Sequence, residues 1–156
     1  MAAFFGLMAI GKSKLHKLLQ NGKKLNSATT WYNAFGVELK EQILKWIQDD
    51  QLKAKGINKD GEVIGYYSLT TSFINPKKTF NSHYTFYDTG EFFRSMFVRV
   101  FPDRITINAD AQKGEDNLFE KYGTEIIGLT DENLEKLKAK ILEHYDKELR
   151  RILFQY

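Results

Sequence analysis

The stretch Ser95-Met-Phe-Val-Arg-Val-Phe-Pro-Asp-Arg-Ile-Thr-Ile-Asn108 decides the fold, because apolar and polar residues alternate on both sides of a turn. Val98 and Val100 fall on one face of an extended chain, as do Ile105 and Ile107 after the turn. The proline between them presets φ, and the aspartate that follows it is a common turn residue. We therefore expect an antiparallel hairpin here.

The last part of the chain predicts a long amphipathic helix. Thr130 is a good N-cap, and Asp131 and Glu132 follow it at the positive end of the helix dipole. One apolar stripe then repeats at helical spacing: Leu134, Leu137, Ile141, Tyr145, Leu149 and Ile152. We expect six residues to be buried where the hairpin packs on the closing helix: Val98, Ile105, Ile107, Leu134, Leu137 and Ile141.

A second long helix is predicted in the N-terminal half, over residues 32–55. Leu39, Ile43, Trp46 or Ile47, and Asp50 follow a 3.6-residue repeat there, and Gly56 is placed to end the helix. The predicted fold class is α+β: an antiparallel β-sheet whose central hairpin packs against this helix and against the long C-terminal helix.

The remaining segments are shorter. Residues 62–68 read as a short strand or extended segment, and residues 70–83 have no periodicity, which is typical of a surface loop. Residues 88–94 form a helical turn that leads into the hairpin, and residues 109–116 are polar and predict a loop. Residues 118–122 are long enough for one or two helical turns before Gly123.

The first 30 residues form an N-terminal arm with a short helix, and residues 31–156 form a single α+β domain. The spacing of Leu15, Leu18 and Leu19 suits that helix, with Asn21-Gly22 as its stop. An apolar run precedes it: Phe4, Phe5, Leu7, Met8 and Ile10. The arm is either a first helix packed on the domain or a segment that docks on a neighbouring subunit. The run is too short for a membrane anchor.

Composition excludes several classes of protein. The chain has 156 residues, the usual length of one domain, and no cysteine, so disulfides, thiolate metal sites and cysteine nucleophiles are ruled out. The net charge of +3 is uneven, because residues 1–56 are basic and residues 57–156 are slightly acidic. Twelve Phe, eight Tyr and two Trp are many for this length, which favours contacts with protein partners.

Few residues suggest catalysis. His16, His83 and His144 lie in three different elements without a nearby metal partner. The octapeptide from Gly6 to Ser13 matches the spacing of a phosphate loop, but no strand precedes it and no strand–helix alternation follows. Acids near the hairpin ends offer a divalent-metal site: Asp88, Glu91, Asp110, Glu115 and Asp116. Acids in loops are usually only solvated, so we expect no enzyme and no cofactor or metal.

Three motifs follow one another in a specific order. They are Asp88-Thr-Gly-Glu-Phe-Phe-Arg-Ser95, Leu118-Phe-Glu-Lys-Tyr-Gly123 and Ile126-Ile-Gly-Leu-Thr-Asp-Glu-Asn-Leu-Glu135. With the hairpin between the first two, this order resembles the virion-morphogenesis and tail-completion proteins of tailed bacteriophages, over about residues 57–150. The chain departs from the family at Phe92 and Phe93, which replace an aliphatic residue, and at Glu91, where Arg or Lys is common.

The resemblance implies a structural virion protein that forms a ring at the head–tail (portal–tail) junction, of the tail-completion or connector (neck) type. Its partners would be itself, in a closed ring of about six or twelve copies, and portal, adaptor or tail proteins. DNA would pass through the channel without sequence-specific binding, and no membrane is involved. The localisation would be the virion, and the host cytoplasm during assembly.

The resemblance assigns motif residues, and the loop and arm supply the expected contacts. The motif residues are Asp88, Thr89, Gly90, Arg94, Ser95, Gly128, Leu129 and Thr130. The apolar run of the arm is expected to dock on a neighbouring subunit. The long loop with Lys77 and Lys78 is expected to reach a neighbouring subunit or the channel. Two alternatives stay open: a basic nucleic-acid or host-factor binder using residues 12–24, and a metal-dependent hydrolase using the hairpin-end acids.

Overall fold

The computed structural model describes residues 12–23, 25 and 27–154. This part of the chain mixes helices with small antiparallel sheets of two strands, β1–β2 and β3–β4. The elements in order are α1 (Lys12–Gly22), α2 (Ser27–Ala34), α3 (Val37–Lys45), η2 (Trp46–Lys55), α4 (Leu69–Ile74), α5 (Glu91–Ser95), β1 (Phe97–Val100), β2 (Ile105–Asn108), β3 (Gln112–Lys113), β4 (Asp116–Asn117), α6 (Leu118–Tyr122), η3 (Thr124–Ile127) and α7 (Asp131–Leu153).

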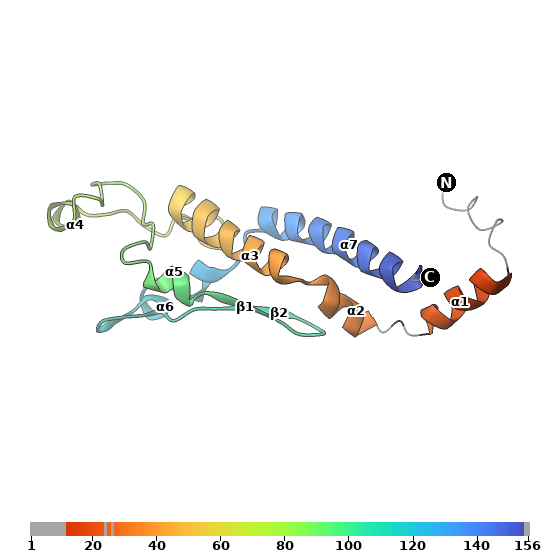
Figure 1. The fold of residues 1–156 in the computed structure, drawn as a ribbon. Helices are drawn as coiled ribbons and strands as arrows, with labels where there is room; N and C mark the ends of the chain where they lie inside the picture. Colours follow the sequence, from red (N-terminus) through yellow and green to blue (C-terminus); the bar gives the residue numbers. More distant parts are fainter. Residues whose placement is uncertain (1–11, 24, 26, 155–156) are drawn as a thin grey trace.

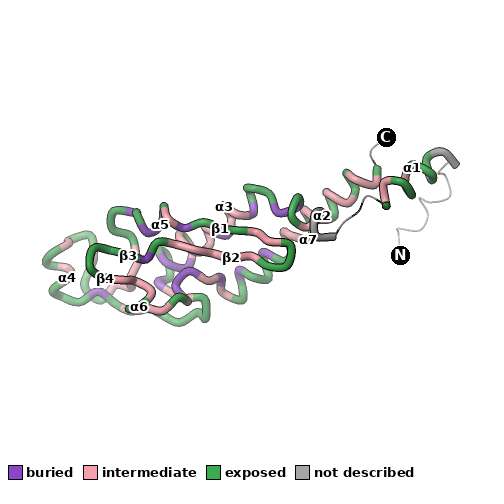
Figure 2. Tube along the Cα trace, turned by 90° about the horizontal axis from the view of Figure 1, so that it is seen from below, coloured by how far each residue is buried: buried purple, intermediate pink, exposed green. Residues whose placement is uncertain are grey.

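The elements form an elongated molecule, with α4 at one end and α1 at the other (Figure 1). Helix α3 runs along the middle, with the β1–β2 hairpin on one side and α7 on the other. Helix α7 also contacts α1 and α2. The hairpin therefore packs chiefly on α3 rather than on the closing helix, which corrects the expected packing. Buried residues concentrate in this middle part of the molecule (Figure 2).

The predicted hairpin is confirmed. Val98 pairs with Ile107 and Val100 with Ile105 in an antiparallel register. The backbone N–H of Phe101 donates to the carbonyl of Arg104 at 2.8 Å and closes the turn. The loop predicted over residues 109–116 was wrong in part, because β3 and β4, two residues each, pair there as a second, smaller hairpin.

The helix predicted over residues 32–55 is not continuous. Helix α2 begins at Ser27 and ends at Ala34, and Gly36 is extended (φ −69°, ψ −179°) before α3 starts. The side chain of Phe35 is buried at this break and joins the core. Apolar periodicity continues through the break, which explains why the sequence pattern suggests one helix.

The second half of the predicted helix, η2, is π-helical. Ile43 and Ile47 are both wholly buried and lie four residues apart, whereas the next buried leucine, Leu52, lies five residues further on. Hydrogen bonds in a π-helix join residues five apart, so the buried face moves forward by one position per turn. The 3.6-residue repeat that reached Asp50 was therefore wrong, and Gln51 is buried instead. Gly56 ends the helix as predicted.

Helix α7 is present as predicted, and its N-cap is confirmed. The backbone N–H of Asn133 donates to the Thr130 hydroxyl at 3.4 Å. Leu137 is buried, but Leu134 is 38% exposed, so the predicted stripe was wrong in its first turn. Asn133 occupies the inward position there and is 1% exposed.

The N-terminal helix α1 also matches its prediction. The Asn21 side chain donates to the carbonyl of Leu153 at 3.2 Å, so α1 meets the C-terminal end of α7. The next helix, α2, places the buried Thr30 against the body of the molecule. The apolar run Phe4, Phe5, Leu7, Met8 and Ile10 lies outside the described residues.

Candidate functional site

Residues 63–87 form a projecting lobe, which we call the α4 lobe (Figure 1). An isolated β-bridge from Ile57 to Val63 joins the base of the lobe to the body. A second bridge, from Tyr66 to His83, lies within the lobe. The loop predicted over residues 70–83 was wrong in part, because it contains most of α4. The Ser68 hydroxyl caps this short helix by accepting from the Thr71 N–H at 3.2 Å.

Large apolar side chains of the α4 lobe face solvent. Leu69 and Phe73 lie four residues apart on one side of α4, and they are 53% and 78% exposed. Ile74 is 80% exposed and Phe80 is 56% exposed. We call these four residues the α4 cap. The lobe contains no Asp or Glu, and its only charged residues are Lys77 and Lys78.

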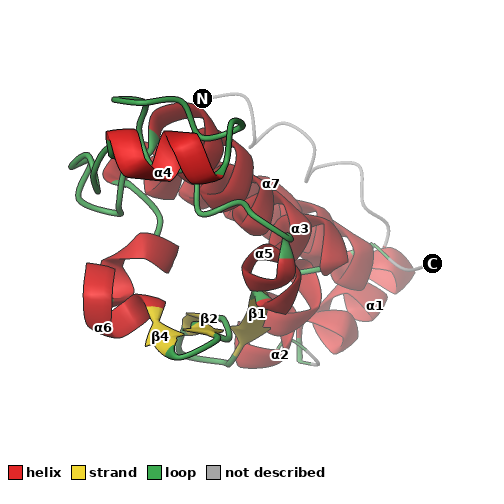
Figure 3. Cartoon of the chain, turned by 90° about the vertical axis from the view of Figure 1, so that its left-hand side faces the viewer, coloured by secondary structure: helices red, strands yellow, loops and turns green. Residues whose placement is uncertain are grey.

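A pocket of about 310 Å³ lies where the inner side of the α4 lobe meets the body. Figure 3 looks along the long axis and shows α4, α5 and α6 around this end of the molecule. The lining residues come from the lobe, from the segment that follows it into α5, from β3 and from α6. They are Tyr67, Thr71, Lys78, Tyr84, Phe86, Tyr87, Asp88, Thr89, Gly90, Glu91, Phe92, Gln112, Lys113, Leu118, Lys121 and Tyr122.

Aromatic rings build the wall of the pocket and attach the lobe. The Tyr84 ring meets Tyr67 edge-on at a centroid distance of 4.9 Å and Tyr122 at 5.6 Å. Phe86 meets Tyr122 at 5.0 Å and 88°. Edge-to-face pairs of this kind contribute beyond their buried area, so the lobe is held on α6 chiefly by ring packing.

Charged groups border the same pocket. The Asp88 carboxylate accepts from the Lys113 ammonium at 3.0 Å and lies 3.8 Å from the Lys78 ammonium. The hydrogen bond from Lys113, with the positive charges of Lys113 and Lys78, holds the pKa of Asp88 below its ordinary value. Asp88 thus connects β3 to the lobe. Of the two predicted contact lysines, Lys78 takes part in this site, while Lys77 is exposed.

The first group of motif residues lies at the entrance to α5. The Arg94 guanidinium donates to the carbonyl of Thr89 at 3.0 Å. Gly90 has a φ of 81°, and a Cβ there would lie 2.9 Å from the Arg94 side chain, so the tight turn requires glycine.

Ser95, the last residue of the first motif, ends α5, and β1 begins at Phe97. Its hydroxyl donates to the carbonyl of Phe92 at 2.7 Å and accepts from the N–H of Asp110 at 2.9 Å. Ser95 therefore joins the start of the hairpin to its exit, which is a structural role.

The second group of motif residues, Gly128, Leu129 and Thr130, lies elsewhere, against the π-helix. The Gln51 amide donates to the carbonyl of Gly128 at 2.8 Å and accepts from the N–H of Thr130 at 3.1 Å. A Cβ at Gly128 would lie 2.7 Å from the Lys59 side chain, so the chain passes close to Lys59 at this glycine. Leu129 is buried in the core.

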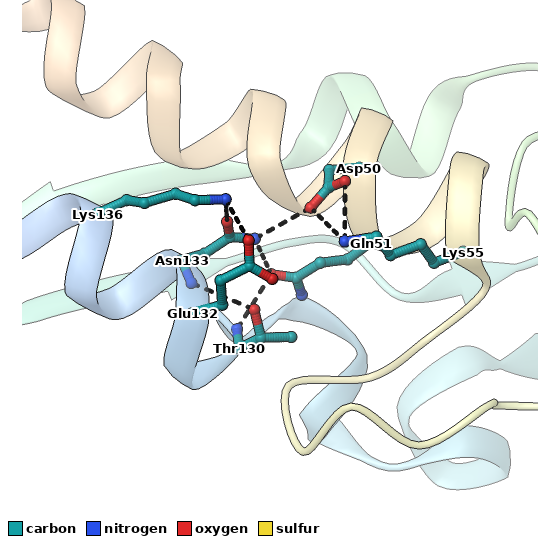
Figure 4. Close-up of polar contacts among 7 residues, drawn as sticks. All are labelled: Asp50, Gln51, Lys55, Thr130, Glu132, Asn133 and Lys136. Atoms are coloured by element: carbon teal, nitrogen blue, oxygen red, sulfur yellow. Dashed lines mark hydrogen bonds and ion pairs between the residues drawn. The ribbon is translucent and has the colours of Figure 1, made fainter.

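Gln51 and Asn133 form a buried amide pair that the sequence analysis missed (Figure 4). The Asn133 side chain donates to the Gln51 side chain at 3.0 Å and to Asp50 at 3.4 Å. Around it lie the ion pairs of Lys55 with Asp50 at 3.2 Å and Lys136 with Glu132 at 2.6 Å. Two features of the sequence point to this pair. Gln51 lies one helical turn after Ile47, and Asn133 lies three residues after the N-cap Thr130.

The other candidate residues are not gathered into one site. Among residues 12–23, 25 and 27–154, no group of three or more His, Asp or Glu side chains is arranged to hold a metal ion. His83 contacts the carbonyl of Lys53 at 2.8 Å and so supports the end of η2. No helix in this part of the chain is both long and apolar enough to span a bilayer.

The fold and site define a class: a mixed helix–strand protein with an aromatic pocket beneath an apolar, carboxylate-free lobe. Comparison with family models, curated proteins and solved structures found no match to this chain.

Proposed function

We propose that this chain is a structural subunit of a tailed-phage virion that forms a closed ring at the head–tail junction, as a tail-completion or connector protein. The order of its three motifs supports the class, and the α4 cap supports assembly. The subunit acts through its contacts with copies of itself and with portal, adaptor or tail proteins, and it needs no catalytic group.

The α4 cap is the observation that carries the proposal. Its four side chains are more than half exposed, and they lie together on one projecting segment of about a dozen residues. Large apolar side chains concentrated on one exposed segment mark protein interfaces, whereas single scattered ones do not. The lobe has no acids, so Lys77 and Lys78 are the only charged side chains beside this apolar surface.

The shape of the subunit supports a ring. A closed ring is built by head-to-tail contacts, which require two different surfaces on each subunit. The α4 lobe lies at one end of the molecule, and α1 lies at the other (Figure 1). The motif residues Asp88, Gly90 and Arg94 support the base of the lobe, which gives the first motif a structural task.

Sedimentation velocity and negative-stain imaging of the full chain test the proposal. The wild-type chain should form discrete oligomers and closed rings as concentration rises, and Phe73→Asp with Ile74→Asp should leave it monomeric. Leu142→Asp is the matched control, because Leu142 is 69% exposed on α7 and lies outside the lobe. A wild-type chain that stays monomeric up to about 1 mM, where even contacts of about 4 kcal/mol are detected, contradicts the proposal.

A further inference from the structure

We infer that the α4 cap of one subunit receives the apolar run of the N-terminal arm from a second copy of the chain. The inference rests on the proposed function and deepens it, because it names the surface and its occupant. The run consists of Phe4, Phe5, Leu7, Met8 and Ile10, and the cap consists of Leu69, Phe73, Ile74 and Phe80.

The chemistry of the two surfaces matches. Residues 1–11 carry no charged side chain, and all five residues of the apolar run lie within them. The cap presents Phe73 and Ile74 at 78% and 80% exposure, with no acid anywhere in the lobe. A basic partner would be repelled by Lys77 and Lys78, whereas an uncharged apolar segment buries its side chains against the cap without leaving a charge unpaired.

The arm cannot reach the cap of its own chain. The C-terminal end of helix α1 contacts the end of α7 that lies far from the lobe, where Asn21 bonds to Leu153. From there, α1 extends away from the lobe, with Lys12 at its far end (Figure 1). Helix α7 is about 35 Å long and α1 adds about 16 Å. Fully extended, residues 1–11 span at most about 40 Å, and the lobe lies beyond the far end of α7. Only a second copy can supply the occupant.

This contact is head-to-tail by geometry. The arm leaves one end of the molecule, and the cap stands at the other end, so each subunit has one arm to give and one cap to fill. Repetition of a heterologous contact closes into a ring when the rotation between subunits closes, and otherwise it produces a filament.

Engineered disulfides test the inference cleanly, because the chain has no cysteine of its own. Phe5→Cys and Phe73→Cys are made in separate full-length chains with different affinity tags, mixed and oxidised. We expect a disulfide-linked heterodimer at twice the mass of one chain. Mixing Phe5→Cys with Leu142→Cys is the matched control, which should give only background. Unchanged melting temperatures of the reduced variants show that each one is folded.

The outcomes separate this inference from the proposed function. If the wild-type chain assembles but the Phe5→Cys and Phe73→Cys pair links no better than the control, the docking site is wrong and the ring proposal stands. A disulfide within one chain that carries both Phe5→Cys and Phe73→Cys overturns the inference that the arm comes from a second copy. If the wild-type chain never assembles, both ideas fail. Amide exchange gives a second measurement: residues 69–74 should be protected in the wild-type assembly and lose that protection when residues 1–11 are deleted.

Discussion

Gln51 joins the π-helix η2 to the start of α7 and to Gly128, two residues before its N-cap. Its side chain is wholly buried, and its amide links the π-helix to Gly128, Thr130 and Asn133. A buried amide is tolerated only when its hydrogen bonds are made, and within the described residues no buried side-chain polar atom lacks a partner. The pair with Asn133 therefore fixes how α7 docks on η2.

A double-mutant cycle measures this link. Gln51→Ala should lower the free energy of unfolding by about 1–3 kcal/mol, because the Thr130 N–H loses its side-chain partner and the side-chain N–H of Asn133 keeps only Asp50. Asn133→Ala should also lower the free energy of unfolding. The loss in the double variant should be smaller than the sum of the losses in the two single variants. Denaturant unfolding gives all four values. Strict additivity would show that the two amides act independently.

Asp88 gives a pH prediction. Because Lys113 and Lys78 lower its folded pKa, the carboxylate stabilises the fold above the unfolded pKa, and this contribution is lost as pH falls through the folded value. The melting temperature of the wild-type chain should therefore exceed that of Asp88→Asn at neutral pH, and the difference should vanish well below about pH 4. The side chain is 40% exposed, so solvent screening keeps the difference small. A difference that grows on acidification would contradict the ion pair.

At the scale of elements, the two long helical segments use their buried faces differently. Helix α7 keeps α-helical spacing, but its first inward position holds Asn133 rather than Leu134. The segment η2 shifts its buried face forward, so that Gln51 and Leu52 are both inside. The polar pair thus sits where the two elements meet, and apolar packing resumes at Leu137.

Truncations along α7 test this assignment. Leu137→Ala should cost about 2–5 kcal/mol, because Leu137 is 5% exposed and its removal leaves a cavity in the core. Leu134→Ala is the matched control and should cost far less, since that side chain is 38% exposed. Urea unfolding of both variants makes the comparison. Equal losses would mean that the first turn of α7 is buried against another surface.

The α4 lobe shows how an element without its own core is held. Ring contacts among Tyr67, Tyr84, Phe86 and Tyr122, with the Asp88 ion pairs, attach it to α6 and β3. This attachment leaves α4 itself free of buried residues. The lobe is therefore a projection held at its base, as expected of a segment that contacts other subunits.

At the scale of the whole molecule, the proposed function requires that DNA pass through the ring without being bound tightly. Duplex binding by the isolated chain should be weak, and its dependence on salt should be shallow, because few phosphates are contacted. Anisotropy titrations between about 50 and 200 mM salt measure this slope. Tight binding that falls steeply with salt would favour the nucleic-acid alternative.

The two lysines of the lobe give a prediction about assembly. Lys77→Glu together with Lys78→Glu should disturb assembly more than Lys77→Glu alone, because only Lys78 lies beside Asp88, at 3.8 Å. Sedimentation velocity distinguishes the two variants, and circular dichroism confirms that both are folded. If both variants impair assembly equally, the overall charge of the lobe matters rather than the contact of Lys78 with Asp88.

Local patterns in the sequence determined the elements whose burial repeats with a constant period. The alternation around Val98 and Ile107 determined the hairpin, and Thr130 with the acids after it determined where α7 begins. These signals lie within a few residues of one another, so neighbouring side chains and backbone groups are enough to produce them. Leu137 was placed in the core for the same reason.

Only the tertiary structure decided the rest. The apolar repeat over residues 32–55 did not predict the break at Gly36 or the π-helical shift after Lys45. Gln51 bonds to Asn133, which lies 82 positions away in the chain. The pocket likewise unites Tyr67, Asp88 and Tyr122 from separate elements. A sequence pattern records which residues are apolar, but the partner that satisfies a buried polar group is chosen only when the chain folds and brings distant segments together.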